Sequence, residues 1–300
     1  MEVITINIQL TDLQSQNNKF MRFGFIGAGK VGFSLGKYFS DNNLNLSGYY
    51  SKNINSAKEA AMFTNSNYYT KLDDIIKNSD VIFITTPDGI IKSVWDSINK
   101  ELINNKIICH CSGSLSSEVF SNIENHNSYG YSIHPLFAFS DKYNSHKTLN
   151  KAFVTIEGSQ EYINYFIDIF TSLGNKVKVI SKENKDMYHT SAVVVSNQIV
   201  ALIKIGIDLL IKCGFNEDEA NEALYPLIVN NINNIHEKGV IDSLTGPIER
   251  CDIETVKKHL LCLNNEDKKL YKMLSKRLIE ISKIKNKNRD YTELENVIGE

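Results

Sequence analysis

The segment spanning residues 23–32 constrains the fold of this chain more than any other. A short apolar run ends in the pattern G-x-G-x-x-G, formed by Gly27, Gly29 and Gly32, and an amphipathic segment begins directly after it. This order of strand, tight turn and helix start is typical of a dinucleotide-binding unit. We expect Gly27 to permit the turn, Gly29 to let a diphosphate approach the backbone, and Gly32 to let the helix pack close to the strand. The other residues of this turn expected to contact the cofactor are Ala28, Lys30 and Val31.

Strand and helix patterns alternate through the first part of the chain and then give way to long helical patterns. The continuous apolar run from Val81 to Ile84 is typical of a parallel strand covered on both faces. We therefore predict an α/β Rossmann-like domain with a mostly parallel, doubly wound sheet, followed by an all-helical domain. The expected boundaries are 1–20 for an N-terminal extension, 21–181 for the dinucleotide-binding domain, 182–285 for a helical domain, and 286–300 for a loosely attached tail. Apolar residues broadly alternate within the extension, so an added edge strand stays open beside the preferred, poorly ordered segment.

Composition excludes several classes of protein. The formal net charge of −2 gives no global basic field of the kind that nucleic-acid binding needs. Five cysteines without metal-like spacing, apart from the adjacent Cys109 and Cys111, indicate reduced thiols, a cytoplasmic setting and no metal centre. The sequence also lacks the pattern of a signal peptide. The most apolar segment, 192–211, is interrupted by polar residues such as Lys204 and Asp208, so we expect a buried helix and no membrane span.

The end of the second predicted strand decides the type of cofactor. An NAD site usually places an Asp or Glu there to accept the ribose hydroxyls, but residues 49–53 contain no carboxylate. A hydroxyl, a cation and a helix start, provided by Ser51, Lys52 and Ser56, are instead placed to bind a 2′-phosphate. The sequence therefore favours NADP, although Lys52 alone could be a solvated loop residue.

Polar residues follow three other predicted strands on the side of the sheet where ligands bind. Thr86 and Pro87 should border the cofactor, and the adjacent Asp88 is either part of that border or the N-cap of the next helix. Ser112 could hold a substrate carboxylate or the nicotinamide carboxamide, the alternative being that Ser116 or Ser117 simply caps a following helix. His134 is expected at a strand end, where it either contacts substrate or has a structural role.

A single long helix is predicted over residues 184–213. Lys185 and His189 lie one turn apart and share a face with Ala192 and Ser196, while Asn197 lies at the edge of this polar stripe. A lysine and a histidine so placed could donate protons to the oxygen or nitrogen that gains charge when hydride leaves NADPH. The alternative is an exposed lysine beside a satisfied interfacial histidine.

Further helices are predicted after this one. Pro226 should kink or split the helix that begins at Glu217. In the turn at 243–252, charged residues either order the loop or, through Arg250, bind an anion. The lysines after residue 267 flank a regular apolar stripe, so they are interpreted as a solvated helix face.

Six motifs together resemble a family of Rossmann-like NADP oxidoreductases whose C-terminal helical domain has no known function. The resemblance spans Met21 to Leu278 and, more distantly, the layout is similar to pyrroline-5-carboxylate reductases, ketopantoate reductases, prephenate dehydrogenases and β-hydroxyacid dehydrogenases. The motifs are FIGAGKVGFSLGKYF, ITTPDGII, HCSGSLSS, SIHPLFAF, KDMYHTSAVVVSN and LTGPIERCD. One departure is Cys251, because the related family usually has glycine there, which leaves the backbone geometry of that turn open.

The resemblance implies an N-terminal NADP-binding domain, a helical domain like that of 6-phosphogluconate dehydrogenase, and a homodimer formed through that helical domain. In the β-hydroxyacid enzymes, a lysine near the start of the long helix and an Asn or His about one turn later assist proton transfer. Lys185 and His189 match that spacing, so the resemblance implies these roles for them.

We therefore expect an NADP-dependent oxidoreductase that transfers hydride between NADPH and a small carbonyl or imine substrate in the cleft between the domains. The residues that would face the substrate are His134, Ser112, Lys185, His189 and Asn197. Two alternatives stay open: a non-catalytic NADP-binding sensor or assembly protein, and a prephenate-type dehydrogenase suggested by the His134-Pro135 pair.

Overall fold

The computed structural model describes residues 21–299, so the predicted extension at 1–20 lies outside the described residues. The chain divides into two compact units, and the division falls after Val194, within one long helix. Each unit has a core of its own and is described by itself.

The first unit contains an eight-stranded sheet with the order β3-β2-β1-β4-β5-β6-β7-β8. The pairs from β3 through β6 are parallel, β7 is antiparallel to β6, and β8 is parallel to β7. The predicted mostly parallel sheet is therefore confirmed. The strands are β1 (Phe23–Ile26), β2 (Leu46–Tyr50), β3 (Asn67–Tyr69), β4 (Val81–Ile84), β5 (Ile107–His110), β6 (Tyr129–Leu136), β7 (Phe153–Gly158) and β8 (Lys176–Val179).

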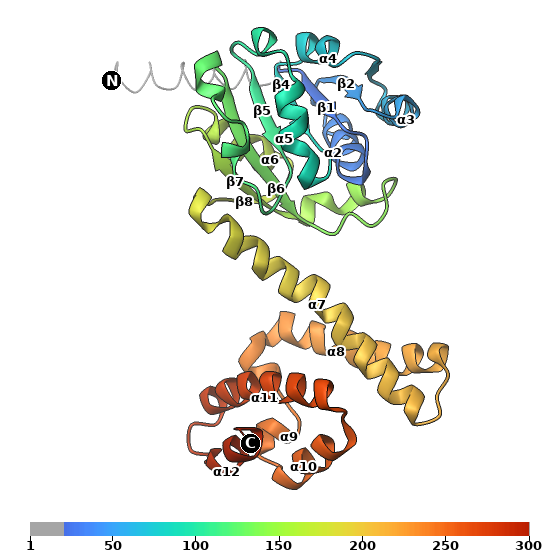
Figure 1. Cartoon of the computed structure of the whole chain (residues 1–300), viewed down its shortest axis with the longest axis vertical. Coiled ribbons are helices and arrows are strands. Elements are labelled where there is room, and N and C mark those ends of the chain that lie inside the picture. The colour runs from blue at the N-terminus through green and yellow to red at the C-terminus, as the bar shows by residue number, and fades with distance from the viewer. Residues whose placement is uncertain (1–20, 300) are drawn as a thin grey trace. The chain divides into compact units, whose positions relative to one another are not determined.

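Helices cover both faces of the sheet (Figure 1). Side chains alternate along β4, because Val81 and Phe83 join the core under α2, α3 and α6, whereas Ile82 and Ile84 join the core under α4 and α5. The continuous apolar run at 81–84 is explained by this two-sided burial. The helices of this unit are α2 (Lys30–Asp41), α3 (Ile54–Thr64), α4 (Leu72–Asn78), α5 (Asp88–Ser97) and α6 (Ile163–Ser172), with short 3-10 turns η1 (Lys100–Leu102), η2 (Ser117–Val119), η3 (Ile123–His126), η4 (Ser145–Lys151) and η5 (Lys182–Asn184).

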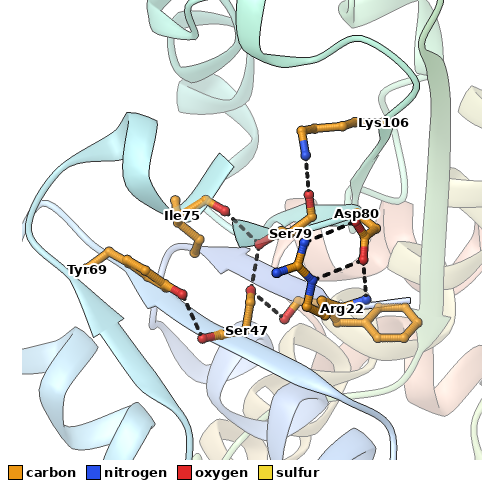
Figure 2. Close-up of polar contacts among 8 residues, drawn as sticks. Arg22, Ser47, Tyr69, Ile75, Ser79, Asp80 and Lys106 are labelled. Atoms are coloured by element: carbon orange, nitrogen blue, oxygen red, sulfur yellow. Dashed lines mark hydrogen bonds and ion pairs between the residues drawn. The ribbon is translucent and has the colours of Figure 1, made fainter. Parts of the chain in front are cut away.

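A polar cluster joins the amino ends of the central strands (Figure 2). The hydroxyls of Ser47 and Ser79 lie 2.6 Å apart, and the Ser79 hydroxyl donates to the carbonyl of Ile75. The backbone amide of Arg22 donates to the carboxylate of Asp80 at 2.9 Å. Because these buried or half-buried groups satisfy one another, they hold the starts of β1, β2 and β4 together and so set where the opposite ends of the strands lie.

The second unit is helical, with a small core under α9 to α12. Its elements are α7 (Lys185–Lys212), which begins in the first unit, and α8 (Glu217–Ser243), α9 (Pro247–Arg250), α10 (Ile253–Cys262), α11 (Asn265–Lys285) and α12 (Thr292–Gly299). A capping box starts α8, since the Asn216 side chain accepts from the Glu219 amide and the Glu219 carboxylate accepts from the Asn216 amide.

Three expectations for the helices are wrong. Pro226 does not split α8, because the non-helical residue inside this helix is Gly239, with φ 79°. The tail is not loosely attached, because Tyr291, Leu294 and Ile298 are buried in the core of this unit. Helix α7 is not buried within this chain, since only 6% of its most apolar window is covered; its apolar residues instead form an exposed surface.

The turn at Cys251 keeps the backbone geometry that favours glycine. Cys251 has φ 60° and ψ 41° at the end of α9, and its thiol donates to the Asp290 carbonyl at 3.4 Å. The next residue, Asp252, caps α10 by accepting from the Thr255 amide. Asp252 thus has an ordering role, and Glu249 also lies 3.5 Å from the guanidinium of Arg289. Anion binding by Arg250 stays a prediction.

Candidate functional site

The glycine turn lies between β1 and α2, and each of its glycines meets a different constraint. Gly27 has φ +110°, a conformation that side chains disfavour. A Cβ atom on Gly32 would lie 2.3 Å from the hydroxyl of Thr85, whereas a Cβ on Gly29 would meet nothing within 4 Å. The backbone is therefore packed tightly at Gly27 and Gly32 and open at Gly29.

The start of α2 provides unpaired donors beside this open position. Gly29 is the N-cap residue, and no side chain caps the helix. Because the first amides of a helix lack intrahelical acceptors and lie at the positive end of its dipole, they can bind an anion. A diphosphate fits this geometry.

A cavity of about 430 Å³ opens at the same edge of the sheet. The hydroxyl of Thr86 is buried without a partner among the described residues, and a bound polar group would satisfy it. The residues lining the cavity are Gly29, Lys30, Val31, Thr85, Thr86, Pro87, Asp88, Cys111 and Phe139. Phe139 and Cys111 were not expected as lining residues; only the topology brings the loop after β6 to the glycine turn.

The predicted 2′-phosphate residues lie just after β2. The Gly27 amide donates to the carbonyl of Tyr50 at 2.8 Å, which places the end of β2 beside the glycine turn. Ser51 and Ser56 are half-buried, Lys52 is exposed, and all three adjoin the first turn of α3. An anionic group bound at this strand end would therefore meet a hydroxyl, a cation and a helix start.

The loop after β5 is held in place by His110, which sequence reasoning missed. One nitrogen of its buried ring lies 3.1 Å from the Ser116 carbonyl, and the other accepts from the Ser112 amide at 3.1 Å. Burial lowers the pKa of His110 to about 4, so the ring is neutral and bridges both ends of the loop.

Asp88 belongs to this site and does not cap α5. The N-cap residue of α5 is Pro87, and the carboxylate of Asp88 accepts from the hydroxyl of Ser112 at 2.6 Å and from that of Ser114 at 3.2 Å. Of the two predicted caps, Ser116 is the N-cap residue of η2 without a side-chain hydrogen bond, whereas Ser117 donates its amide and hydroxyl to Glu157. The loop is thus joined to the cavity lining through Asp88.

Lys185 is the best-buried charged group of the predicted set, with 2% of its surface exposed. Its ammonium donates to the carbonyl of Ser112 at 3.0 Å and to the hydroxyl of Ser132 at 2.6 Å. Burial lowers its pKa to about 8, while the carboxylates of Glu157 and Asp88 act in the opposite direction. Lys185 therefore joins the start of α7 to the ends of β5 and β6.

Two imidazoles pack against Gly113. A Cβ on Gly113 would lie 2.7 Å from Nδ1 of His189 and 3.1 Å from Nε2 of His134, so only glycine fits between them. The sequence predicted His134 at the end of a strand, but it lies within β6. Burial, with the Lys185 cation as the next cause, lowers its pKa to about 4. Nδ1 of His189 is buried without a partner among the described residues.

The structure thus brings Ser112, His134, Lys185 and His189 together around the carboxyl end of β5 and the adjoining part of β6. Asn197 lies on α7 beyond Val194, in the second unit, so its predicted role stays a prediction. A neutral imidazole, a second imidazole and a buried cation around one strand end can donate hydrogen bonds to a carbonyl oxygen or an imine nitrogen and stabilise charge there.

Two family models match separate parts of the chain. Residues 22–112 match the family described as NADP oxidoreductase coenzyme F420-dependent, and residues 152–278 match a domain of unknown function, DUF2520. No curated protein matches this chain.

Solved structures share the fold. Protein TM1727 from Thermotoga maritima is 26% identical, with a TM-score of 0.72 over 87% of this chain and 98% of that chain. A reductive aminase from Aspergillus terreus, in complex with NADPH and ethyl-5-oxohexanoate, is 10% identical, with a TM-score of 0.66 over 87% and 94% of the two chains. Pyrroline carboxylate reductase from Plasmodium falciparum, with NADP bound, is 14% identical, with a TM-score of 0.58 over 94% and 99%. At these low identities, the last two show a common fold alone.

Proposed function

We propose that this chain, which joins an NADP oxidoreductase family domain to a DUF2520 domain, transfers hydride between NADPH and a small carbonyl or imine compound. One observation carries the proposal: Asp88 lines the cavity beside the glycine turn and also accepts from Ser112, whose carbonyl accepts from Lys185. The dinucleotide subsite and the cluster of proton-donating groups are therefore linked by hydrogen bonds at one edge of one sheet.

For the cofactor, the diphosphate would bind the open amides at the start of α2, and the 2′-phosphate would bind Ser51, Lys52 and Ser56. The absence of an acidic residue at 49–53 supports NADP over NAD, because a carboxylate there would repel the phosphate. The test is a thermal-shift titration with NADPH and NADH, using Lys52→Ala and the control Lys58→Ala, an exposed lysine within α3. Selective stabilisation by NADPH that is lost in Lys52→Ala supports the assignment; equal stabilisation by both cofactors, or by neither, contradicts it.

When bound, NADPH would supply a hydride to the substrate carbon. The electrons of the C=O or C=N π bond would pass to the oxygen or nitrogen, which would take a proton from water, so that an alcohol or amine is formed. His134 and His189 would donate hydrogen bonds to that atom. The positive charge of Lys185, next to the Ser112 carbonyl, would stabilise the negative charge that develops on it. Because Lys185 is buried, its effect would reach the substrate mainly through charge and through the position of the Ser112 loop.

The substrate class rests on the donors present and on two neighbours of the same fold. The reductive aminase was crystallised with a keto ester, and the pyrroline carboxylate reductase bears the name of an imine substrate. We extend this class to the present chain as part of the proposal. That the substrate lies between the two domains stays a prediction.

Turnover is tested by following NADPH oxidation with keto acids, keto esters and cyclic imines, and NADP reduction with hydroxy acids and prephenate. Loss of activity in His189→Asn with unchanged NADPH affinity supports catalysis. If the wild type binds NADPH but no compound reacts, the sensor or assembly role replaces the enzymatic one. Reaction with prephenate alone would establish the prephenate-type alternative.

We also propose that a second copy of the chain covers the apolar surface of α7 and α8. Val195, Val200 and Leu227 are 72%, 64% and 62% exposed, and exposed apolar groups gathered on helices indicate an interface. Light scattering coupled to gel filtration tests this: Leu227→Lys should give monomers, whereas Met62→Lys, an exposed apolar site on α3, should not. A monomeric wild type would contradict the homodimer.

Among the described residues, α7 is also the one helix long and apolar enough to cross a membrane, by length and composition. We interpret it as a helix of a soluble protein, because Lys185 at its start is bound to the sheet and Lys204 pairs with Asp208 in its last third. The five cysteines are unpaired, which fits the predicted cytoplasmic setting.

A further inference from the structure

Tyr188 is a neighbour of the candidate site that the sequence patterns did not single out. It lies half-buried on α7, and its hydroxyl oxygen is 2.7 Å from Nδ1 of His134. The two rings meet edge to face, with centroids 5.6 Å apart and an interplanar angle of 84°. The phenol therefore contacts one nitrogen of the imidazole, Nδ1.

The direction of this hydrogen bond decides where His134 carries its hydrogen. His134 is neutral near physiological pH, so only one of its ring nitrogens is protonated. A phenol is a better donor than a neutral imidazole N–H, and an unprotonated imidazole nitrogen is a better acceptor than a phenol oxygen. Donation from Tyr188 to Nδ1 is therefore the favoured arrangement, and it would leave the hydrogen of His134 on Nε2.

Nε2 is the nitrogen that faces the candidate site. It lies 3.1 Å from the position that a Cβ of Gly113 would occupy, and Nδ1 of His189 lies 2.7 Å from the same position. A hydrogen on Nε2 thus points to the surface where the two imidazoles converge. With the opposite tautomer, this nitrogen would be an acceptor and could not donate to a carbonyl oxygen or an imine nitrogen.

We propose that Tyr188 is a positioning residue that holds His134 in the Nε2–H tautomer, so that the site presents a hydrogen-bond donor to its substrate. The inference rests on the proposed function in which His134 faces the substrate. It deepens that function, because a fixed donor selects a substrate whose reacting atom is an acceptor, such as a ketone oxygen or a neutral imine nitrogen.

The test begins with the full chain and needs no turnover. Nitrogen-15 NMR of protein with labelled histidines reports which ring nitrogen is protonated. The His134 signals are assigned as those that disappear in His134→Gln. We expect an unprotonated, hydrogen-bonded Nδ1 and a protonated Nε2. A protonated Nδ1 in the wild type would overturn the proposal, whether or not the protein oxidises NADPH.

The second measurement uses Tyr188→Phe, which keeps the ring and removes the hydroxyl. We expect the His134 signals to shift toward a mixture of tautomers and kcat/KM to fall about tenfold, with the Kd for NADPH unchanged. Tyr69→Phe is the matched control, because it also removes a hydroxyl that is hydrogen-bonded, here to the Ser47 carbonyl at 3.1 Å, at the other end of the strands. Tyr69→Phe should change neither the His134 signals nor kcat/KM. An unaltered tautomer in Tyr188→Phe would overturn the proposal, whereas the expected spectra without any turnover would contradict the proposed function alone.

Discussion

The ammonium of Lys185 lies 2.6 Å from the hydroxyl oxygen of Ser132, where the first turn of α7 meets β6. Since Lys185 is buried, this contact and that with the Ser112 carbonyl replace its water shell. Lys185 is thereby a charged group of the candidate site, and its hydrogen bonds also attach the start of α7 to the sheet.

Lys185 should make stability depend on pH in the alkaline range. Burial lowers its pKa from 10.5 to about 8, so between these values the unfolded chain holds more protons than the folded one. The free energy of unfolding contributed by this group therefore rises with pH across that window, and the cost of the buried charge is fully present below it. We expect the free energy of unfolding of the wild type, relative to that of Lys185→Met, to rise by on the order of 3 kcal/mol from about pH 7.5 to about pH 10. Urea unfolding of both proteins at the two pH values measures this change. A constant difference would contradict the lowered pKa.

Gly113→Ala should impair the site more than the fold. Its new methyl group would collide with the imidazoles of His134 and His189, and we expect kcat/KM to fall about 100-fold because small displacements of donors are costly. Gly89→Ala is the control, since a Cβ there meets nothing within 4 Å. Steady-state kinetics with equal activity in both variants would show that the imidazoles do not act on the substrate.

Gly29 and Gly32 should separate cofactor binding from folding. Gly29→Ala places a methyl group in open space, so stability should be kept while the Kd for NADPH rises at least about tenfold. Gly32→Ala overlaps the Thr85 hydroxyl and the Gly27 carbonyl, and should lower the free energy of unfolding by about 1–3 kcal/mol. Isothermal titration and urea unfolding measure the two effects. Unchanged NADPH affinity in Gly29→Ala would remove the diphosphate from this position.

Cys251→Gly should stabilise the helical unit. Cys251 has φ 60°, where a side chain costs about 1 kcal/mol, and glycine removes this strain at the expense of one weak thiol hydrogen bond. We expect a gain of up to about 1 kcal/mol in thermal or urea unfolding. The β-branched Cys251→Val should be destabilised, and equal stability of the two variants would contradict the strain.

Local chemistry predicted much of the sheet domain. The glycine turn could be predicted because Gly27 has a positive φ and Gly32 packs too closely against Thr85 for a side chain, while Gly29 leaves the backbone open. The strand from Val81 to Ile84 could be predicted because a strand covered on both faces has no polar side. The spacing of Lys185 and His189 likewise indicated a shared helix face. Patterns left alternatives open where a distant contact decides, as at Asp88, which lines the cavity and accepts from Ser112 and Ser114 and does not cap a helix.

By itself, the sequence determined the kind of fold, the dinucleotide turn and the residues of the long helix that carry proton donors, because these follow from periodicity and from the steric needs of single residues. Only the tertiary structure decided that Tyr188 meets His134, that His110 braces the Ser112 loop, and that Phe139 lines the cavity. Those contacts join segments far apart in the chain, and the order of strands in the sheet, which brings them together, leaves no periodic pattern in the residues themselves.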